Sequence, residues 1–125
     1  MQRNDLTGMR ILVVEDNALV ADMIADILVM AGAEVVGPTG WVATALELAG
    51  DGRLHGALLD VNLHGDPSFP VAAVLRQRGI PFIFLTGYGE PDALPPVFRG
   101  VPRLIKPFRE DDLAMLISVQ FRAEV

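Results

Sequence analysis

Short apolar runs recur along this chain and alternate with longer segments in which apolar residues return every three or four positions. Short runs bounded by turn residues are typical of buried parallel strands, and the longer pattern is typical of amphipathic helices. Strands are predicted at residues 10–15, 33–36, 56–61, 81–85 and 103–105. We expect Gly37-Pro38 to break the second strand. The fifth strand is expected at a sheet edge, where Pro102 removes no ladder hydrogen bond.

Helix signals lie between these runs. Asn17 is the predicted N-cap of a first helix, which Gly32 stops. Thr39 is the predicted N-cap of a second helix, which ends at Gly50, and a third helix ends at Gly79. The apolar face expected for the first helix comprises Leu19, Val20, Met23, Ile24, Ile27, Leu28 and Ala31.

The last third of the chain has a different composition. Residues 87–102 contain three glycines and four prolines, and both residue types disfavour helix interiors. We therefore expect the fourth helix to be short, around residues 93–98, or disordered. A last helix is expected near Glu110, because acidic residues in a first turn complement the positive end of the helix dipole. Its apolar residues are Leu113, Met115, Leu116, Val119 and Phe121.

Five strand–helix units of this size predict an α/β fold, namely a (βα)5 doubly wound parallel sheet of the flavodoxin-like type. Right-handed crossovers and the commonest order for five strands give 2-1-3-4-5. In such sheets, ligands bind at the carboxyl ends of the strands, beside the point where the strand order reverses. The residues at those ends are therefore the candidates for function.

Composition narrows the classes of function. The 125 residues are 51% hydrophobic, and this length suits one domain, which we place at residues 9–125 after an N-terminal lead at residues 1–8. The net charge of −6 disfavours binding to nucleic acid and to anionic membrane surfaces. The chain has no cysteine, so a disulfide scaffold is excluded and a cytoplasmic location is expected. Its apolar runs are far shorter than the ~20 residues of a membrane-spanning helix.

Charged and polar residues stand at four predicted strand ends. The first strand closes on Glu15 and Asp16, the third on Asp60, the fourth on Thr86 and the fifth on Lys106, the only lysine in the chain. Three carboxylates held together repel one another unless a cation neutralises them, and oxygen ligands suit Mg²⁺. A metal, an ammonium and a hydroxyl around one carboxylate are arranged to receive a phosphoryl group, for which Asp is a known nucleophile.

Four motifs at these strand ends resemble the receiver domain of two-component response regulators, over residues 9–125. They are VVED at residues 13–16, LLDVNL at 58–63, FLTGYG at 84–89 and KPF at 106–108. The segment PFIFLTGYG at residues 81–89 is similar to the PFxFATGYG segment of a bacterial subgroup of single-domain, CheY-like receivers. The order and placement of all four motifs make the resemblance specific.

The resemblance implies that Asp60 is the phospho-acceptor. It also implies that Glu15 and Asp16 hold Mg²⁺ together with Asp60 and with the backbone carbonyl of Asn62. The phosphoryl donor would be a phosphohistidine on a histidine kinase or a histidine phosphotransfer protein.

Two further positions match the family, and one departs from it. The resemblance implies that Thr86 and Lys106 contact the phosphoryl group, and that the Lys106-Pro107 peptide bond is cis. Most receivers have Tyr or Phe three residues before this lysine as a rotameric switch, but this chain has Arg103. We therefore expect the usual coupling to be altered, with Tyr88 as a possible substitute that covers the site.

Three other residues are conspicuous. We expect Trp41 to cover the core near the start of the second helix, with no ligand implied. His64 is interpreted as a polar surface residue rather than a metal ligand, and no role is assigned to His55.

The leading hypothesis is a stand-alone phospho-receiver that signals through contacts with a downstream protein and is a monomer or a weak dimer. A phosphate sink for a shared kinase and a docking module that is never phosphorylated are the alternatives. An enzyme of the aspartyl-phosphate phosphatase class is not expected, because that class typically needs a second carboxylate two residues after the nucleophile, and this chain has Asn62 there. The identities of the kinase, the target and the signal are not predicted.

Overall fold

The structure is a computed structural model, and it describes residues 5–87 and 94–121. Five parallel strands form one sheet in the order β2-β1-β3-β6-β7. These strands are β1 (Arg10–Val14), β2 (Glu34–Thr39), β3 (Gly56–Asp60), β6 (Phe82–Gly87) and β7 (Arg103–Lys106). The predicted flavodoxin-like fold and its strand order, 2-1-3-4-5 when only these strands are counted, are confirmed.

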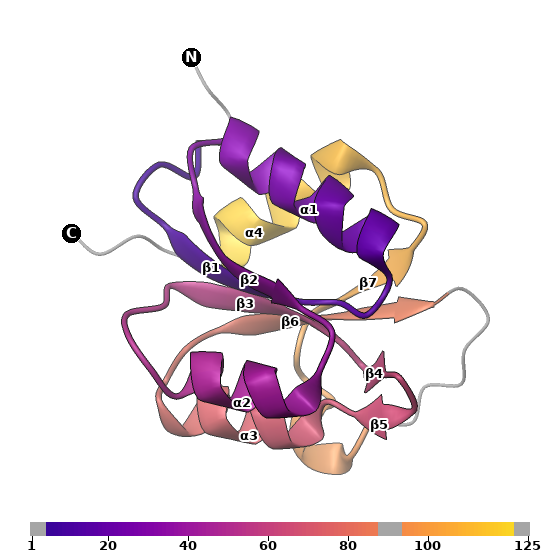
Figure 1. Cartoon of the computed structure of the whole chain (residues 1–125). Helices are drawn as coiled ribbons and strands as arrows, with labels where there is room; N and C mark the ends of the chain where they lie inside the picture. Colours follow the sequence, from indigo (N-terminus) through magenta and orange to yellow (C-terminus); the bar gives the residue numbers. More distant parts are fainter. Residues whose placement is uncertain (1–4, 88–93, 122–125) are drawn as a thin grey trace.

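Two helices cover each face of the sheet (Figure 1). The helices α1 (Ala18–Met30) and α4 (Glu110–Gln120) lie on one face, and α2 (Val42–Ala49) and α3 (Phe69–Gln77) lie on the other. Each face has its own core. Ile11, Ile24 and Leu28 belong to the first core, and Leu12 and Phe84 belong to the second. Alternate residues of β1 therefore point to opposite layers, as the period of a strand requires.

The ends of α1 follow from its sequence. The Asn17 side chain accepts a hydrogen bond from the Val20 N–H at 3.1 Å, so Asn17 is the N-cap as predicted. After the helix, Gly32 adopts a φ of +99°, and its N–H donates to the Val29 carbonyl while the Ala33 N–H donates to Leu28. This pattern is a Schellman motif, which needs a left-handed residue that glycine supplies without strain.

Two predictions about the second strand–helix unit are wrong. Gly37-Pro38 does not end β2, because the strand continues to Thr39 through an irregularity in its register with β1. Pro38 is tolerated there because β2 pairs with one neighbour, so a missing N–H on the outer edge costs no ladder bond. Thr39 is not the N-cap either. The helix starts at Val42 after Trp41, and the Thr39 hydroxyl accepts a hydrogen bond from the Trp41 N–H at 3.3 Å.

A small hairpin follows β3 and was not predicted. The strands β4 (Asn62–Leu63) and β5 (Asp66–Pro67) pair antiparallel across His64 and Gly65, which adopt φ values of +51° and +88°. Two consecutive residues with positive φ are typical of the I′ turns that close two-residue hairpins.

The chain before β7 contains no fourth long helix among its described residues. A single 3-10 turn, η1 (Pro96–Phe98), stands there, which agrees with the predicted short helix. Residues 88–93 lie outside the described part. Of the described helices, none is long and apolar enough to cross a membrane.

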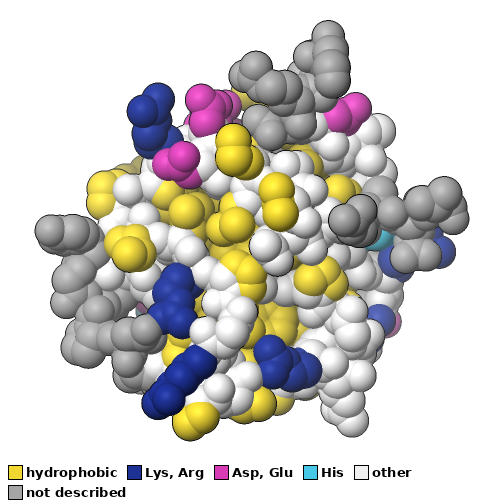
Figure 2. All heavy atoms as spheres, turned by 180° about the vertical axis from the view of Figure 1, so that it is seen from behind, with side chains coloured by type: hydrophobic (Ala, Val, Ile, Leu, Met, Phe, Trp, Pro, Cys, Tyr) yellow, Lys and Arg dark blue, Asp and Glu magenta, His cyan; other side chains and the backbone are white. Residues whose placement is uncertain are grey.

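Some apolar helix residues face solvent instead of the core. Leu19 is 82% exposed and Met23 is 43% exposed on α1, and Met115 and Val119 are exposed on α4. Ile24, Ile27 and Leu28 of the predicted face are buried, and Ala21, which was not part of that prediction, is buried as well. The apolar face predicted for α1 was therefore too wide. Figure 2 shows hydrophobic side chains at the surface on the side opposite to the view of Figure 1.

Candidate functional site

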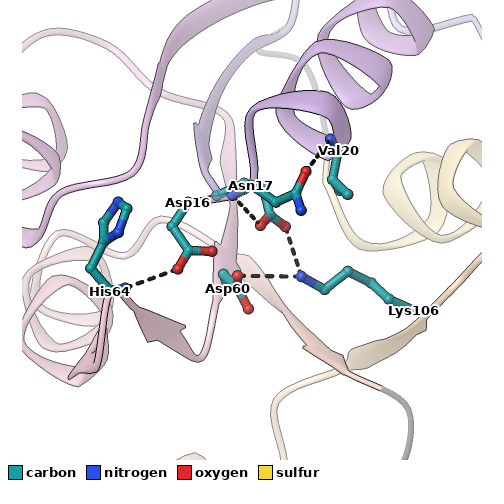
Figure 3. A network of polar contacts seen from close by, with 7 residues as sticks. Asp16, Asn17, Val20, Asp60, His64 and Lys106 are labelled. Atoms are coloured by element: carbon teal, nitrogen blue, oxygen red, sulfur yellow. Dashed lines mark hydrogen bonds and ion pairs between the residues drawn. The ribbon is translucent and has the colours of Figure 1, made fainter.

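Three carboxylates meet at the carboxyl ends of β1 and β3. Glu15 and Asp16 follow directly after β1, and Asp60 is the last residue of β3. Since β1 and β3 are neighbours in register, with Val14 beside Leu59, their ends lie at the same edge of the sheet. One oxygen atom from each carboxylate lies within 4.8 Å of the others. The predicted acidic cluster is therefore present (Figure 3).

The ammonium group of Lys106 reaches this cluster from the end of β7. Its Nζ lies 3.0 Å from Glu15 Oε1 and 3.3 Å from Asp60 Oδ2. The Glu15 side chain is fully buried, and the Asp60 side chain is 8% exposed. The sequence placed Lys106 opposite Asp60, and the structure adds that Glu15 shares the same ammonium. Lys106 thus partly neutralises two buried carboxylates at once. The Lys106-Pro107 peptide bond is cis.

Glu15 also anchors the start of α1. Its Oε2 accepts a hydrogen bond from the Asn17 N–H at 3.0 Å, and the Asn17 side chain in turn caps the helix. Both oxygens of Glu15 are therefore engaged, one by a backbone N–H and one by Lys106. A carboxylate held this way has little freedom to rotate, so the orientation of the Glu15 side chain in the site is fixed.

The third carboxylate residue, Asp16, is contacted by residues of two loops. Its Oδ2 accepts a hydrogen bond from the backbone N–H of His64 at 2.9 Å. On its other side lies Gly40, where an added Cβ would stand only 2.9 Å from the Asp16 Cα. The next residue, Trp41, stacks its indole on the His64 imidazole, with ring centroids 3.9 Å apart and planes 16° apart. An aromatic contact thus joins the two loops that contact Asp16, namely the β2–α2 loop and the turn of the β4–β5 hairpin.

A pocket of about 280 Å³ opens on this side of the cluster, and Asp16, Asp22, Thr39, Trp41 and His64 are among its lining residues. Trp41 is 59% exposed, so the prediction that it covers the core is wrong. His64 is exposed at the surface, as predicted. His55 is buried, and its Nδ1 accepts a hydrogen bond from the Arg10 N–H at 3.0 Å.

The crowding of charge shifts three pKa values. Burial and the nearby Glu15 raise the pKa of Asp60 to about 8, although Lys106 acts in the opposite direction. Burial acts against the charged form of Lys106, but Glu15 and Asp60 outweigh it and hold the pKa of Lys106 above its ordinary value. For Asp16, burial is outweighed by the hydrogen bond from His64 and by the neighbouring carboxyls, so its pKa is lowered. Without a further cation, Asp60 therefore holds a proton near neutral pH.

The donor atoms of this cluster fit Mg²⁺. All three are carboxylate oxygens, two of them largely buried, and hard divalent cations prefer such oxygens. Lys106 supplies one positive charge against three carboxylates, so the cluster can still accept a cation. A cation there would lower the pKa of Asp60 and leave its oxygens ionised.

The remaining predicted residues lie as follows. Thr86 is half-buried near the end of β6, one residue beyond Leu85, which pairs with Asp60. Asn62 is exposed in β4, two residues after Asp60. Arg103 begins β7 and donates a hydrogen bond to the Arg99 carbonyl at 3.3 Å. Tyr88, the predicted cover residue, lies outside the described residues.

Sequence reasoning missed the contribution of the hairpin. The dipeptide His64-Gly65 is a signal for a tight turn, because both residue types tolerate positive φ more readily than most. That signal does not reveal that the His64 N–H meets Asp16 or that its ring meets Trp41. Both contacts join residues more than 20 positions apart.

Comparisons with known proteins identify relatives of this architecture. The chain is similar to SdrG from Sphingomonas melonis Fr1, with 43% sequence identity, a TM-score of 0.79, and coverage of 88% of this chain and 93% of SdrG. A structure of the BeF3-activated conformation of SdrG, assigned to Pseudomonas melonis Fr1, matches at 39% identity and a TM-score of 0.73, and covers 90% of this chain and 96% of that one.

A second relative carries a metal. The receiver domain of the sensor histidine kinase PA1611 from Pseudomonas aeruginosa PAO1, described with a magnesium ion coordinated in its active site cleft, is 25% identical. The TM-score is 0.79, and the match covers 91% of this chain and 98% of that domain.

Among curated proteins, the uncharacterized transcriptional regulatory protein YbdJ of Bacillus subtilis (strain 168) is 28% identical over 113 residues, which is 88% of this chain. This chain spans about half, 49%, of the length of YbdJ. No family model matches the chain. The strand order, the acidic cluster with its lysine, and the likeness to SdrG over nearly the whole of both chains lead to one conclusion: the chain belongs to the CheY-like response regulator receiver domains of two-component signalling.

Proposed function

We propose that this chain accepts a phosphoryl group on Asp60 from a phosphohistidine of a histidine kinase or histidine phosphotransfer protein, in a Mg²⁺-dependent reaction, and signals through protein contacts. The observation that carries the proposal is the position of Asp60 beside Lys106 and two further carboxylates, in a site whose oxygens suit a divalent cation. The Mg²⁺ described in the PA1611 receiver domain supports the same assignment here.

Each residue has a chemical task in this proposal. An ionised oxygen of Asp60 attacks phosphorus, the P–N bond of the donor breaks, and its electron pair stays on the imidazole nitrogen, which takes up a proton. Glu15, Asp16, Asp60 and the Asn62 carbonyl would hold Mg²⁺, which would supply positive charge for the phosphoryl oxygens.

The transferred group needs partners once it is bound. In this proposal the Lys106 ammonium, already 3.3 Å from Asp60, moves its contact from the carboxylate to a phosphoryl oxygen. Such charge-assisted bonds are stronger than those between neutral groups. The Thr86 hydroxyl donates to another phosphoryl oxygen from the end of β6. Glu15 stays in place because the Asn17 N–H holds it.

Mass spectrometry after incubation with a small phosphodonor and Mg²⁺ tests the proposal. We expect the mass to rise by one phosphoryl group. This adduct should not form when a chelator removes the metal before the phosphodonor is added, nor in the Asp60→Asn variant. The Asp26→Asn variant removes an exposed carboxylate of α1 and should be labelled like the wild type.

The other outcomes identify the alternatives. Rapid consumption of the donor without a stable adduct would indicate a phosphatase, and no adduct at all would indicate a docking module. A separate assay with purified kinases would distinguish an output regulator from a phosphate sink. The cytoplasmic location and the monomeric or weakly dimeric state stay predictions.

A further inference from the structure

The stacked rings of Trp41 and His64 are not explained by the core or by the proposed chemistry. Neither residue belongs to the two hydrophobic cores, and the indole is 59% exposed. An aromatic side chain that leaves more than half of its surface in water gains less from burial than one in the core. The contact between the rings is close and nearly parallel, with centroids 3.9 Å apart and planes 16° apart.

The stack joins two segments that both meet Asp16. On one side, Trp41 follows Gly40, whose backbone lies against the Asp16 Cα. On the other side, the His64 N–H donates to Asp16 Oδ2 at 2.9 Å. Figure 3 shows the hydrogen bond from His64 to Asp16, with Asp60 and Lys106 beyond it. Movement of either segment would therefore change the position of this carboxylate.

The hairpin that carries His64 depends on contacts outside itself, one of which is made by Leu63, a β4 side chain buried in the second core. It has only two residue pairs, Asn62 with Pro67 and Leu63 with Asp66, and isolated two-stranded hairpins are at best marginally stable in water. Its turn also places His64 at a φ of +51°, where Asn or Gly would be the favoured residue. A histidine at this position keeps the N–H that Asp16 needs and adds a ring that can hold the hairpin against the β2–α2 loop.

We infer that Trp41 and His64 are positioning residues for the metal site: their stack holds the hairpin so that the His64 N–H keeps the Asp16 carboxylate directed toward Glu15 and Asp60. The inference rests on the Mg²⁺ site proposed above. In this inference the two exposed rings raise the affinity for the metal indirectly, through Asp16, without contacting the metal.

Mg²⁺ affinity of the purified chain, measured by isothermal titration calorimetry, tests the inference. Trp41→Ala removes one ring. His64→Asn removes the other but keeps the backbone N–H and gives the preferred Asn-Gly turn. Each variant should bind Mg²⁺ about two- to tenfold more weakly, the range expected for loss of an aromatic pair. The double variant should bind no more weakly than the weaker-binding single variant, because both changes remove the same contact.

Two controls separate positioning from general damage. Trp41→Phe keeps an aromatic ring and should recover most of the affinity. Met30→Ala truncates another exposed apolar side chain, 85% exposed at the far end of α1, and should bind Mg²⁺ like the wild type. All variants should keep wild-type circular dichroism, because no core side chain changes.

The possible results are distinct. Wild-type affinity in Trp41→Ala and His64→Asn would overturn the inference and leave the metal site standing. Additive losses in the double variant would also overturn it, because the rings would then act separately. A wild-type protein that binds no Mg²⁺ would remove the proposed metal site and this inference together.

Discussion

Replacing Asp60 by Asn should make the metal-free protein more stable, and the gain should grow with pH. Asp60 is only 6% exposed, and burial together with Glu15 raises its pKa from 3.8 to about 8. The folded protein therefore holds a proton on Asp60 over a pH interval in which the unfolded chain has released it. Asparagine has nearly the same shape as Asp and needs no proton to stay neutral.

The sign and the size follow from the two pKa values. Because the folded state binds more protons, the stability that Asp60 contributes is complete below about pH 4 and is lost as the pH rises toward its folded pKa. The loss is about 1.4 kcal/mol per pH unit within that interval. Between pH 5.5 and pH 7.5 the wild type should lose about 2–3 kcal/mol relative to Asp60→Asn, which retains the Lys106–Glu15 ion pair.

Urea unfolding of both proteins at the two pH values, with a chelator present, measures this difference. Subtracting the unfolding free energies of the two proteins at each pH isolates the contribution of position 60. The exposed-site variant Asp26→Asn should show no comparable pH dependence. Saturating Mg²⁺ should reduce the advantage of Asp60→Asn, because a cation stabilises the wild-type carboxylates by binding the folded state.

A difference between the two proteins that does not change over this pH range would refute the reasoning. So would an Asp60→Asn protein that is less stable than the wild type at pH 7.5. Either result would mean that Lys106 compensates Asp60 fully and that no repulsion is stored in the metal-free site.

Three other substitutions test the charge balance of the site, a close backbone contact beside it and the packing of the core away from it. Lys106→Met should lower the free energy of unfolding by about 3 kcal/mol in metal-free buffer at pH 8, because it leaves buried carboxylates without their cation; a loss below 1 kcal/mol would contradict the proposed neutralisation. Gly40→Ala should weaken Mg²⁺ binding in calorimetry, because its Cβ would displace the Asp16 backbone, whereas Gly100→Ala, which has open space around it, should not. Gly56→Ala should lower the free energy of unfolding by about 1–3 kcal/mol, and with it the melting temperature, because its methyl group would overlap the Phe121 ring. An unchanged melting temperature would mean that this ring can move aside.

The sequence by itself determined the order of strands and which of their ends form the candidate site. Strand positions follow from short apolar runs, because a strand buried on both faces needs apolar residues at consecutive positions. The topology then brings Glu15, Asp16, Asp60 and Lys106 to one edge of the sheet, since parallel strands share a direction. These features depend on local pattern and on general rules of chain connection, so the tertiary structure was not needed to find them.

The boundaries and burial of the helices depended on tertiary packing. Leu19 and Met23 have the spacing of an apolar face, yet Ala21 is buried in their place. Periodicity defines a stripe on a helix but not its rotation against the layer below, which is a matter of side-chain volume.

The surroundings of Asp16 were likewise decided only by the tertiary structure. Trp41 and His64 are 23 positions apart and stack, and the backbone N–H that holds Asp16 comes from a residue 48 positions away. A backbone N–H is present in nearly every residue, so its type carries no signal of its use. Only the folded chain determines which N–H, which ring face and which glycine meet at one carboxylate, because these contacts depend on the relative placement of loops.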